Sequence, residues 1–412
     1  MNNPLEELSA PTVARGDRRK LRVLGTDVTL IEPIRVLAEQ EIGCDVEYIL
    51  AAEGDAERIA ITKPASFDVY DHFFHSVDLV WAAGVIQPID IRRLKQWDLV
   101  TGLTKLGCLT STSREGAGEA PVTRLYVQAD GGLDRRATSQ ISMLPLVHNV
   151  DSFGYFRESA SALGFKPPES WAWFLDDRWK GHVSMVVNPT IGLMELALAA
   201  QAAGHMEFKD IGKLSLVEID RLLDLLEKRT KASHFNSFWT VPAEAEAVIE
   251  RKPTIISSLW SPSYMALRRK GLKIRSAVPV EGYRAWHGGI SFSSRIAPDT
   301  LDLAYEYANF WLSGKPGAII SRDGHYVSAP EAARSHLTQD EWDYWYIGQP
   351  ARVALNGSDG QPIVDKGEVR DGGSYAQRIS NIAVWNSTMP EHNYIVRRWG
   401  NILKNVHIPT MR

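Results

Sequence analysis

Short apolar runs of strand-like character alternate with helical segments through the first hundred residues of this chain. Residues 21–24 form an apolar run that ends at a Gly-Thr turn. Residues 32–42 follow with apolar side chains at helical spacing, closed by Gly43, and residues 46–50 alternate as a strand does. This order predicts an α/β layer on a parallel or mixed sheet, because a helix between two strands returns the chain to the same end of the sheet.

The pattern continues beyond residues 105–140, a segment rich in Gly, Ser, Thr and Arg with little periodicity. A stretch of this length between elements is usually functional or disordered. The clearest later helix covers 214–229, where the leucines and an isoleucine share one face. The same patterns predict helices at 76–83, 193–203, 301–312 and 394–405, and strands at 67–70, 85–89, 179–187, 254–259 and 274–280.

The length and charge of the chain limit the classes of protein that it can be. At roughly 100–200 residues per domain, 412 residues favour two or three domains or lobes. The net charge of −4 gives neither a basic surface for nucleic acid nor an acidic field that collects cations. No apolar run approaches the roughly 20 residues that a membrane helix needs. We therefore expect a globular chain with more than one lobe that does not bind nucleic acid.

Two cysteines and two histidines are the candidates for a disulfide or a metal site. Cys44 and Cys108 lie outside any CxxC pair, so one bridge or two separate thiols are the alternatives, and separate thiols are favoured. His72 and His75 have an i, i+3 spacing, but a metal site needs about three protein ligands, and no third has local spacing. We expect no metal and no other cofactor. The absence of GxGxxG, GxxxxGK[ST], HExxH and GxSxG motifs argues against an enzyme.

Residues 1–20 form a polar N-terminal extension. They contain two prolines, a glycine and a charge cluster, but not the apolar core of about 7–15 residues that a secretory signal needs. Arg18 and Arg19 resemble a twin-arginine signal only faintly, because a strand follows them. Three expectations stay open: a cytoplasmic protein, a signal omitted from this sequence, and a misplaced start codon.

Five segments match, in their order and spacing, the pattern of a known family. The segments are LRVLGTDV, FDVYDHFFHSVDLVWAAGVIQPIDIRRL, ESWAWFLDDRWKGHVSMV, FNSFWTVPAEAEAVIERKPTIISSLWSPSYMALRRKG and HYVSAP. Together they resemble the extracellular solute-binding proteins of bacterial ABC importers, and among these the spermidine/putrescine-binding type. The likeness runs from about residue 21 to about residue 337.

The resemblance implies an α/β chain of two lobes joined by crossover strands, the type II periplasmic-binding-protein fold. It places 21–148 and 288–335 in lobe 1, and 149–287 and 336–412 in lobe 2. It also implies a periplasmic monomer that traps a small ligand in the cleft between the lobes and delivers it to ABC permease and ATPase subunits. Hinged closure of the lobes on the ligand is then the mechanism.

Family members clamp their ligands between aromatic rings, which fits the unusual content of 13 tryptophans. Carried over position by position, the resemblance predicts a cleft lined by Thr26, Asp27, Phe73, Phe74, His75, Asn188, Thr190, Trp239, Trp260, Trp286, His287, Gly288, Tyr326 and Asn386. Trp385 is a weaker match. Six tryptophans are expected in the core instead: Trp171, Trp173, Trp179, Trp311, Trp342 and Trp345.

The acids expected of a polyamine site are missing from this sequence. Polyamine binders of this type place an Asp two residues after the crossover Trp, where this chain has Gly288. They place a carboxylate pair where it has Asn188 and Thr190, with only Glu195 close by. Because a buried cation needs a partner, we expect another ligand: a quaternary ammonium held by cation–π contacts, or a flat ring. Arg284 and nearby histidines are candidates for a contact to an anionic group.

Two alternatives stay open at this point. One is a ferric or other metal-binding receptor of the same fold, for which Tyr264 and Tyr326 are the candidate ligands. Ferric binders usually present adjacent tyrosines, and these two are far apart in the sequence. The other alternative is a cytoplasmic α/β enzyme whose site no motif reveals.

Overall fold

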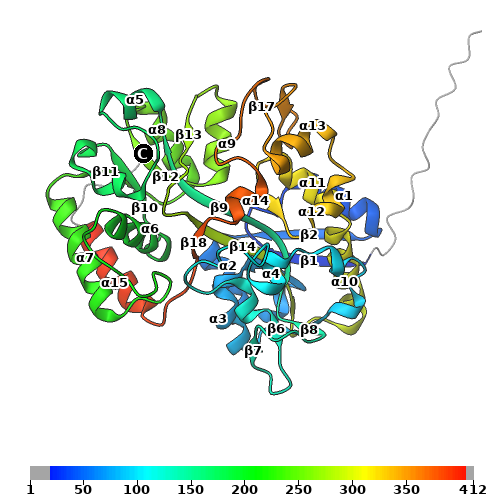
Figure 1. The fold of residues 1–412 in the computed structure, drawn as a ribbon. Helices are drawn as coiled ribbons and strands as arrows, with labels where there is room; N and C mark the ends of the chain where they lie inside the picture. The colour runs from blue at the N-terminus through cyan, green and yellow to red at the C-terminus, as the bar shows by residue number, and fades with distance from the viewer. Residues whose placement is uncertain (1–18, 405–412) are drawn as a thin grey trace, which may run out of the picture.

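The computed structural model describes residues 19–404, in which two long antiparallel strands join two lobes (Figure 1). These crossover strands are β9 (Leu144–Tyr155) and β14 (Tyr283–Ser293), and His148 lies opposite His287 between them. One mixed sheet runs through both lobes in the order β11-β10-β12-β9-β14-β3-β1-β2. The predicted two-lobed α/β fold is confirmed, and the expected N-terminal extension lies almost entirely outside the described residues.

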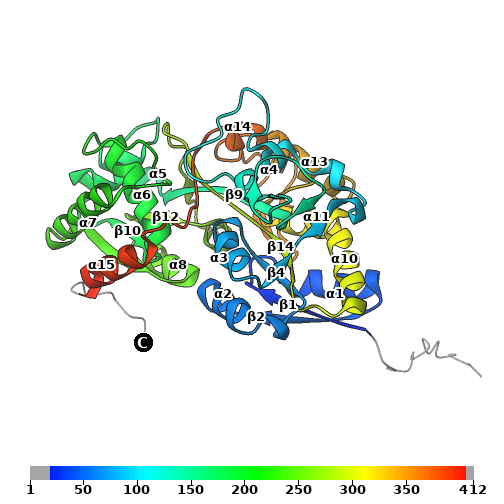
Figure 2. The same ribbon diagram turned by 90° about the horizontal axis from the view of Figure 1, so that it is seen from below.

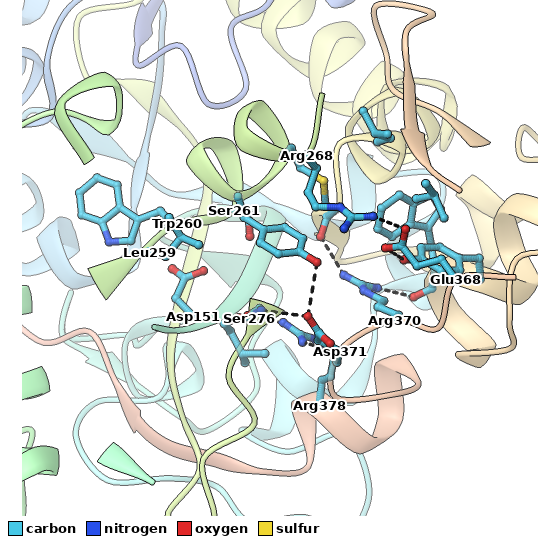
Figure 3. A pocket seen from close by; sticks show the side chains of 18 residues that line it. Asp151, Leu259, Trp260, Ser261, Arg268, Ser276, Glu368, Arg370, Asp371 and Arg378 are labelled. Carbon is cyan, nitrogen blue, oxygen red and sulfur yellow. Dashed lines mark hydrogen bonds and ion pairs between the residues drawn. The ribbon is translucent and has the colours of Figure 1, made fainter. Parts of the chain in front are cut away.

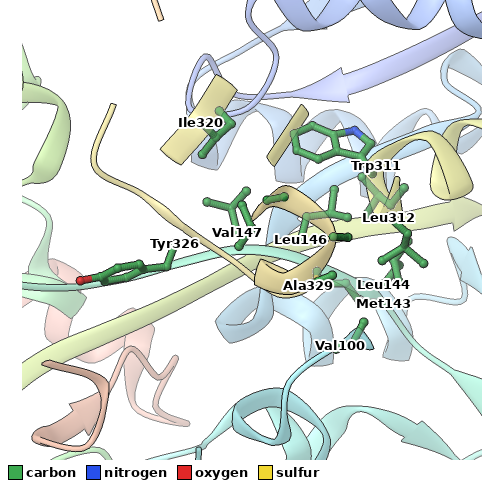
Figure 4. Packing of buried hydrophobic residues seen from close by; sticks show 14 of the residues in the cluster. Val100, Met143, Leu144, Leu146, Val147, Trp311, Leu312, Ile320, Tyr326 and Ala329 are labelled. Carbon is green, nitrogen blue, oxygen red and sulfur yellow. The ribbon is translucent and has the colours of Figure 1, made fainter. Parts of the chain in front are cut away.

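The first lobe is built on parallel strands that extend the sheet beyond β14. Its central strand β1 (Lys20–Gly25) pairs with β2 (Asp45–Leu50) and β3 (Val69–Phe73). The helices of this lobe are α1 (Glu32–Ile42), α2 (Glu53–Thr62), α3 (Val77–Ala82), α10 (Pro298–Leu312), α11 (Lys315–Arg322) and α12 (Pro330–Arg334). Figure 4 shows part of its apolar core, where Leu146 and Val147 of β9 pack near Trp311 and Ile320.

The second lobe repeats this arrangement on the other side of β9. Strand β10 (Val183–Val186) pairs in parallel with β11 (Phe235–Trp239) and β12 (Ile256–Leu259). Its helices are α5 (Arg157–Ala162), α6 (Pro189–Ala202), α7 (Leu216–Lys231), α8 (Pro242–Arg251), α9 (Ser261–Arg269) and α15 (His392–Lys404). The six tryptophans expected in the core are all buried, so that prediction is confirmed.

Residues 105–140 are ordered, unlike the loop that the sequence indicated. Short strands form a second sheet in the order β5-β8-β6-β7, preceded by helix α4 (Gly102–Leu106). The strands are β5 (Ile89–Asp90), β6 (Tyr126–Val127), β7 (Leu133–Asp134) and β8 (Gln140–Ile141). Strands of two residues are too short to show the alternation that identifies a strand in sequence. Val122 and Leu125 of this segment are buried and pack in the core of the first lobe.

The chain after Leu337 divides between the two lobes. Helices α13 (Gln339–Trp342) and α14 (Tyr375–Ile379) belong to the first core, as do residues of the hairpin β16 (Leu355–Asn356) and β17 (Pro362–Val364). Helix α15 packs on α6 and α7 of the second lobe (Figure 2). Ala383 and Val384 of β18 (Ile382–Trp385) also belong to the second core. This packing differs from the expected assignment of 336–412 to lobe 2. We propose that lobe 1 extends to about Ile379 and that β18 lies at the junction of the two cores; the other expected boundaries stay predictions.

Two further expectations concern the cysteines and the membrane. Cys44 and Cys108 are both free thiols, as favoured from the sequence. Within residues 19–404, none of the helices has the length and apolar character needed to span a bilayer.

Candidate ligand-binding cleft

Most of the predicted site residues follow the carboxyl ends of parallel strands. In lobe 1, Thr26 and exposed Asp27 follow β1, and Phe73 ends β3. In lobe 2, Asn188 follows β10 and Trp260 follows β12. In α/β sheets, ligands bind outside the carboxyl ends of the strands, because loops and helix N-termini converge there. The fold therefore brings segments far apart in the sequence to the junction between the lobes.

Lobe 1 contributes a group of aromatic rings around Trp286 on β14. Its indole meets the ring of Phe73 edge to face, with centroids 5.5 Å apart, and it lies 5.6 Å from the imidazole of His325. The His75 ring stacks on Phe73 at 5.5 Å. Gly288 leaves space here, since a Cβ on it would lie 3.5 Å from Phe73 in ordinary contact. Trp286 and Phe73 are only partly buried, so both retain surface for a ligand.

Lobe 2 contributes Trp260, at the start of α9. Its indole packs edge to face on Trp239, with centroids 4.8 Å apart. Trp239 is fully buried, whereas Trp260 is partly exposed. Trp239 therefore packs against Trp260 from inside the lobe and has no exposed surface for a ligand.

Polar side chains of the two lobes face one another beside these rings. His75 Nε2 lies 2.7 Å from Glu53 Oε1 in lobe 1, and Thr190 Oγ1 lies 3.2 Å from His392 Nδ1 in lobe 2. Burial lowers the pKa of His392, and the charge of His75 lowers it further. The two imidazoles are therefore close enough to repel when both are protonated. Asn188 is used locally, because its side-chain oxygen caps the N-terminus of α6.

A buried ion network lies where β14 crosses between the lobes. Arg284 Nε donates to Glu195 Oε1 at 3.2 Å, Nη2 to Asp151 Oδ2 at 3.3 Å, and Nη1 to Asn386 Oδ1 at 2.9 Å. Burial raises the pKa of both carboxyls, and Arg284 opposes that rise. Arg284 is thus engaged by protein groups. The sequence interpretation missed Asp151, although one acid in an otherwise apolar strand is a signal for a buried pair.

Several other predicted residues are enclosed in the first lobe. His287 Nε2 lies 2.9 Å from Thr104 Oγ1, and burial lowers its pKa to about 3. Phe74 and Tyr326 are buried as well. Trp385 Nε1 donates to the Glu115 carbonyl at 2.7 Å from inside the core. These side chains lie inside the lobe, behind the cleft. The sequence predicted them as cleft residues from their positions alone, and a position in the sequence does not determine which way a side chain points.

Both histidines of the i, i+3 pair are engaged by other protein groups. No group of three or more His, Cys, Asp or Glu in residues 19–404 is placed to hold a metal ion. His72, the partner proposed for His75, instead hydrogen-bonds Ser76 and Ser291 inside the lobe, at 3.1 and 2.9 Å.

A cavity of about 30 Å³ adjoins the cleft beside Trp260 and Asp151 (Figure 3). Helix α9 forms one wall, and residues between Tyr344 and Arg378 form the other. Three arginines in its lining had no place in the sequence interpretation: Arg268, Arg370 and Arg378. Arg370 and Arg378 lie beyond residue 337, where the family resemblance weakens, whereas Arg268 lies within a matched segment.

Comparison with known proteins finds a family model that matches part of the chain. Residues 157–345 match the family model described as bacterial extracellular solute-binding protein. No curated protein sequence matches the chain.

Solved structures share the fold over nearly the whole chain. PotD, the spermidine/putrescine ABC transporter substrate-binding protein of Streptococcus pneumoniae, has 12% identity and a TM-score of 0.62, covering 94% of this chain and 98% of its own. The Atu4243-GABA receptor has 14% identity and a TM-score of 0.59, covering 95% and 100%. AgtB of Agrobacterium tumefaciens, in complex with agropinic acid, has 12% identity and a TM-score of 0.56, covering 94% and 99%.

The family and these structures are transport-related binding proteins rather than enzymes, so the enzyme alternative is set aside. The resemblance inferred from the sequence is confirmed. Residues 157–345 are thus similar to the bacterial extracellular solute-binding proteins, and the chain as a whole has the two-lobed fold of periplasmic binding proteins.

Proposed function

We propose that this chain captures a small amine-like organic solute, a quaternary ammonium or an aromatic amine, in the cleft between its lobes. The observation that supports this is the set of partly exposed rings at the lobe junction: Phe73 and Trp286 from lobe 1 and Trp260 from lobe 2. Aromatic faces attract cations without supplying a formal charge, and Trp does so best. The related structures carry solutes as different as GABA and agropinic acid, so the side chains, rather than the fold, must select the ligand.

Three of the acids near the cleft are already paired, and exposed Asp27 is the predicted cleft acid that remains, which argues against a free polyamine with several ammonium groups. Glu53 is bound to His75, and both Glu195 and Asp151 are bound to Arg284. A polyamine would bring two or more ammonium groups, and each needs a carboxylate or several acceptors when it loses water.

We further propose that the protein works as a periplasmic monomer that presents its closed form to permease and ATPase subunits. The family name supports a location outside the cytoplasm. Cell fractionation and light scattering on the purified chain check these two points. Recovery from the cytoplasm alone, or a stable dimer, would contradict them.

The ligand class is tested by thermal unfolding against glycine betaine, choline, tyramine, putrescine and spermidine. We expect a betaine, choline or an aromatic amine to raise the melting temperature most, and Trp286→Ala to abolish that rise. Trp97→Ala is the matched control, because it removes a buried lobe-1 tryptophan remote from β14. It should lower the melting temperature without changing the rise. The largest rise with spermidine, or a rise that survives Trp286→Ala, contradicts the proposal.

A further inference from the structure

The cavity beside Trp260 borders residues of the proposed cleft and has its own chemistry. Trp260 and Ser261 of lobe 2 line it, as does Asp151, whose carboxyl also receives a hydrogen bond from the cleft residue Trp286. Figure 3 shows Arg370 and Arg378 on the opposite side, from the segment that packs with lobe 1. A ligand held at Trp286 therefore lies next to the cavity.

Two of the three arginines that line this cavity form no ion pair within the described residues. Glu368 pairs with Arg268 and Asp371 with Arg275, while Asp151 shares Arg284 with Glu195. The charges of Asp151 and Asp371 also act on Arg378, although neither lies within ion-pair distance of it. Arg370 and Arg378 are left over, since in the described part of the chain no carboxylate lies within ion-pair distance of either. Two guanidinium groups at one cavity without a counter-ion are unfavourable unless an anion joins them.

The contacts of these two arginines hold them in place without neutralising them. Arg370 donates to the carbonyls of Trp345 at 2.5 Å and Gly324 at 3.0 Å, and its guanidinium lies over the Tyr326 ring. Arg378 donates to the carbonyls of Asp371 at 2.7 Å and Val150 at 3.1 Å. Carbonyls orient a guanidinium, but they add no negative charge.

Further donors around the cavity have no acceptor. Arg378 Nε, Trp260 Nε1 and Trp345 Nε1 are buried N–H groups without a hydrogen-bond partner among the described residues. Helix α9 begins here at Ser261, and no side chain caps it. A helix N-terminus, like a guanidinium, favours negative charge. The volume of about 30 Å³ holds roughly two water molecules, or a group of similar size.

We propose that this cavity receives the carboxylate of the transported solute. The solute is then a zwitterion, with its ammonium group at the rings of Phe73 and Trp286 and its carboxylate between Arg370, Arg378 and the start of α9. This rests on the proposed function, because it extends the same ligand from the aromatic cleft into the cavity. Spermidine and putrescine, which lack a carboxylate, do not satisfy the site.

The test uses ω-amino acids, each paired with the alkylamine of the same length, together with glycine betaine paired with tetramethylammonium. Affinities are measured by titration calorimetry on the whole chain. We expect at least one carboxylate-bearing member to bind about tenfold or more tightly than its partner, because a hydrogen-bonded charge is gained. Arg370→Gln and Arg378→Gln should each remove that preference. Arg352→Gln, an exposed arginine paired with Asp340 and Asp343, should leave it unchanged.

The variants also separate a binding role from a folding role. Arg370→Lys keeps the charge and should retain part of the preference, while circular dichroism without ligand shows that each variant is folded. If no carboxylate member binds better than its amine, or if Arg370→Gln and Arg378→Gln keep the preference, the inference is wrong. Amine binding that still depends on Trp286 in that case leaves the proposed function standing. Loss of all Trp286-dependent binding contradicts both.

Discussion

Arg284 and Glu195 form an enclosed ion pair 3.2 Å apart, which ties crossover strand β14 to helix α6 of the second lobe. Their side chains are 1% and 0% exposed. Asp151 on β9 shares the same guanidinium, so one arginine holds both crossover strands and α6. This group fixes the position from which Trp286, two residues along β14, reaches the cleft.

Removing the arginine should therefore destabilise the whole chain. Arg284→Met leaves two buried carboxylates without a partner, and we expect the free energy of unfolding to fall by about 3–5 kcal/mol. Urea denaturation followed by circular dichroism measures the change. Arg352→Met is the matched control, since its ion pairs are exposed, and it should cost less than about 1 kcal/mol. Equal losses in the two variants would contradict this account of the network.

The two neighbouring glycines of β14 should respond differently to a methyl group. A Cβ on Gly289 would lie 2.1 Å from the Leu144 carbonyl oxygen, so the crossover strands would have to separate. A Cβ on Gly288 meets nothing closer than 3.5 Å. We expect Gly289→Ala to lower the free energy of unfolding by about 1–3 kcal/mol and Gly288→Ala to have little effect. The same denaturation measurement decides, and the reverse order would show that the strand packing is described wrongly.

Asp71 should make the stability of lobe 1 depend on pH. Burial raises the pKa of Asp71 to about 7, and the nearby Thr29 hydroxyl offsets this only in part. The unfolded chain has the ordinary value of about 3.9. Between these values the folded protein keeps a proton that the unfolded chain has lost. The contribution of Asp71 to the free energy of unfolding therefore falls as pH rises from about 4 to about 7 and does not recover above it. Buried His148 and His287, whose pKa values burial lowers, contribute in the opposite direction.

Asp71→Asn tests this dependence, because the amide cannot ionise. At each pH, the difference between the free energies of unfolding of the variant and the native protein is compared. We expect this difference to favour the variant by up to about 4 kcal/mol more above about pH 7 than at about pH 4. Urea denaturation at several pH values measures both proteins. A constant difference between them across this range would show that Asp71 does not titrate as its burial requires.

Elements with several turns or alternating positions were predictable from the sequence. Helix α1 covers the predicted residues 32–42, and α10 and α15 lie within three residues of their predicted starts and one of their predicted ends. The strand expected at 274–280 is reduced to Arg275–Ser276, because it pairs only with the end of β9. Apolar composition shows that a segment is buried, but it does not show whether a neighbouring strand is there to pair with it.

The candidate site was predictable only in part, for a similar reason. Trp260 and Trp286 lie on elements that the family resemblance aligns well, and both retain exposed surface. Trp239 and Tyr326 have comparable positions at strand ends, yet the packing of α8 and α14 encloses them. Arg370 and Arg378 gain significance only because the chain after Leu337 folds back against α9. Such a long-range contact leaves no local pattern in the sequence.

The central claim, that a solute binds between the lobes and closes them through Trp286, is tested most directly by small-angle X-ray scattering. The native protein and Trp286→Ala are measured without ligand and with the solute from the thermal screen that stabilises the native protein most. The account predicts a smaller radius of gyration for the native protein with solute and no change for Trp286→Ala. Stabilisation without compaction, or equal compaction of both proteins, would contradict it.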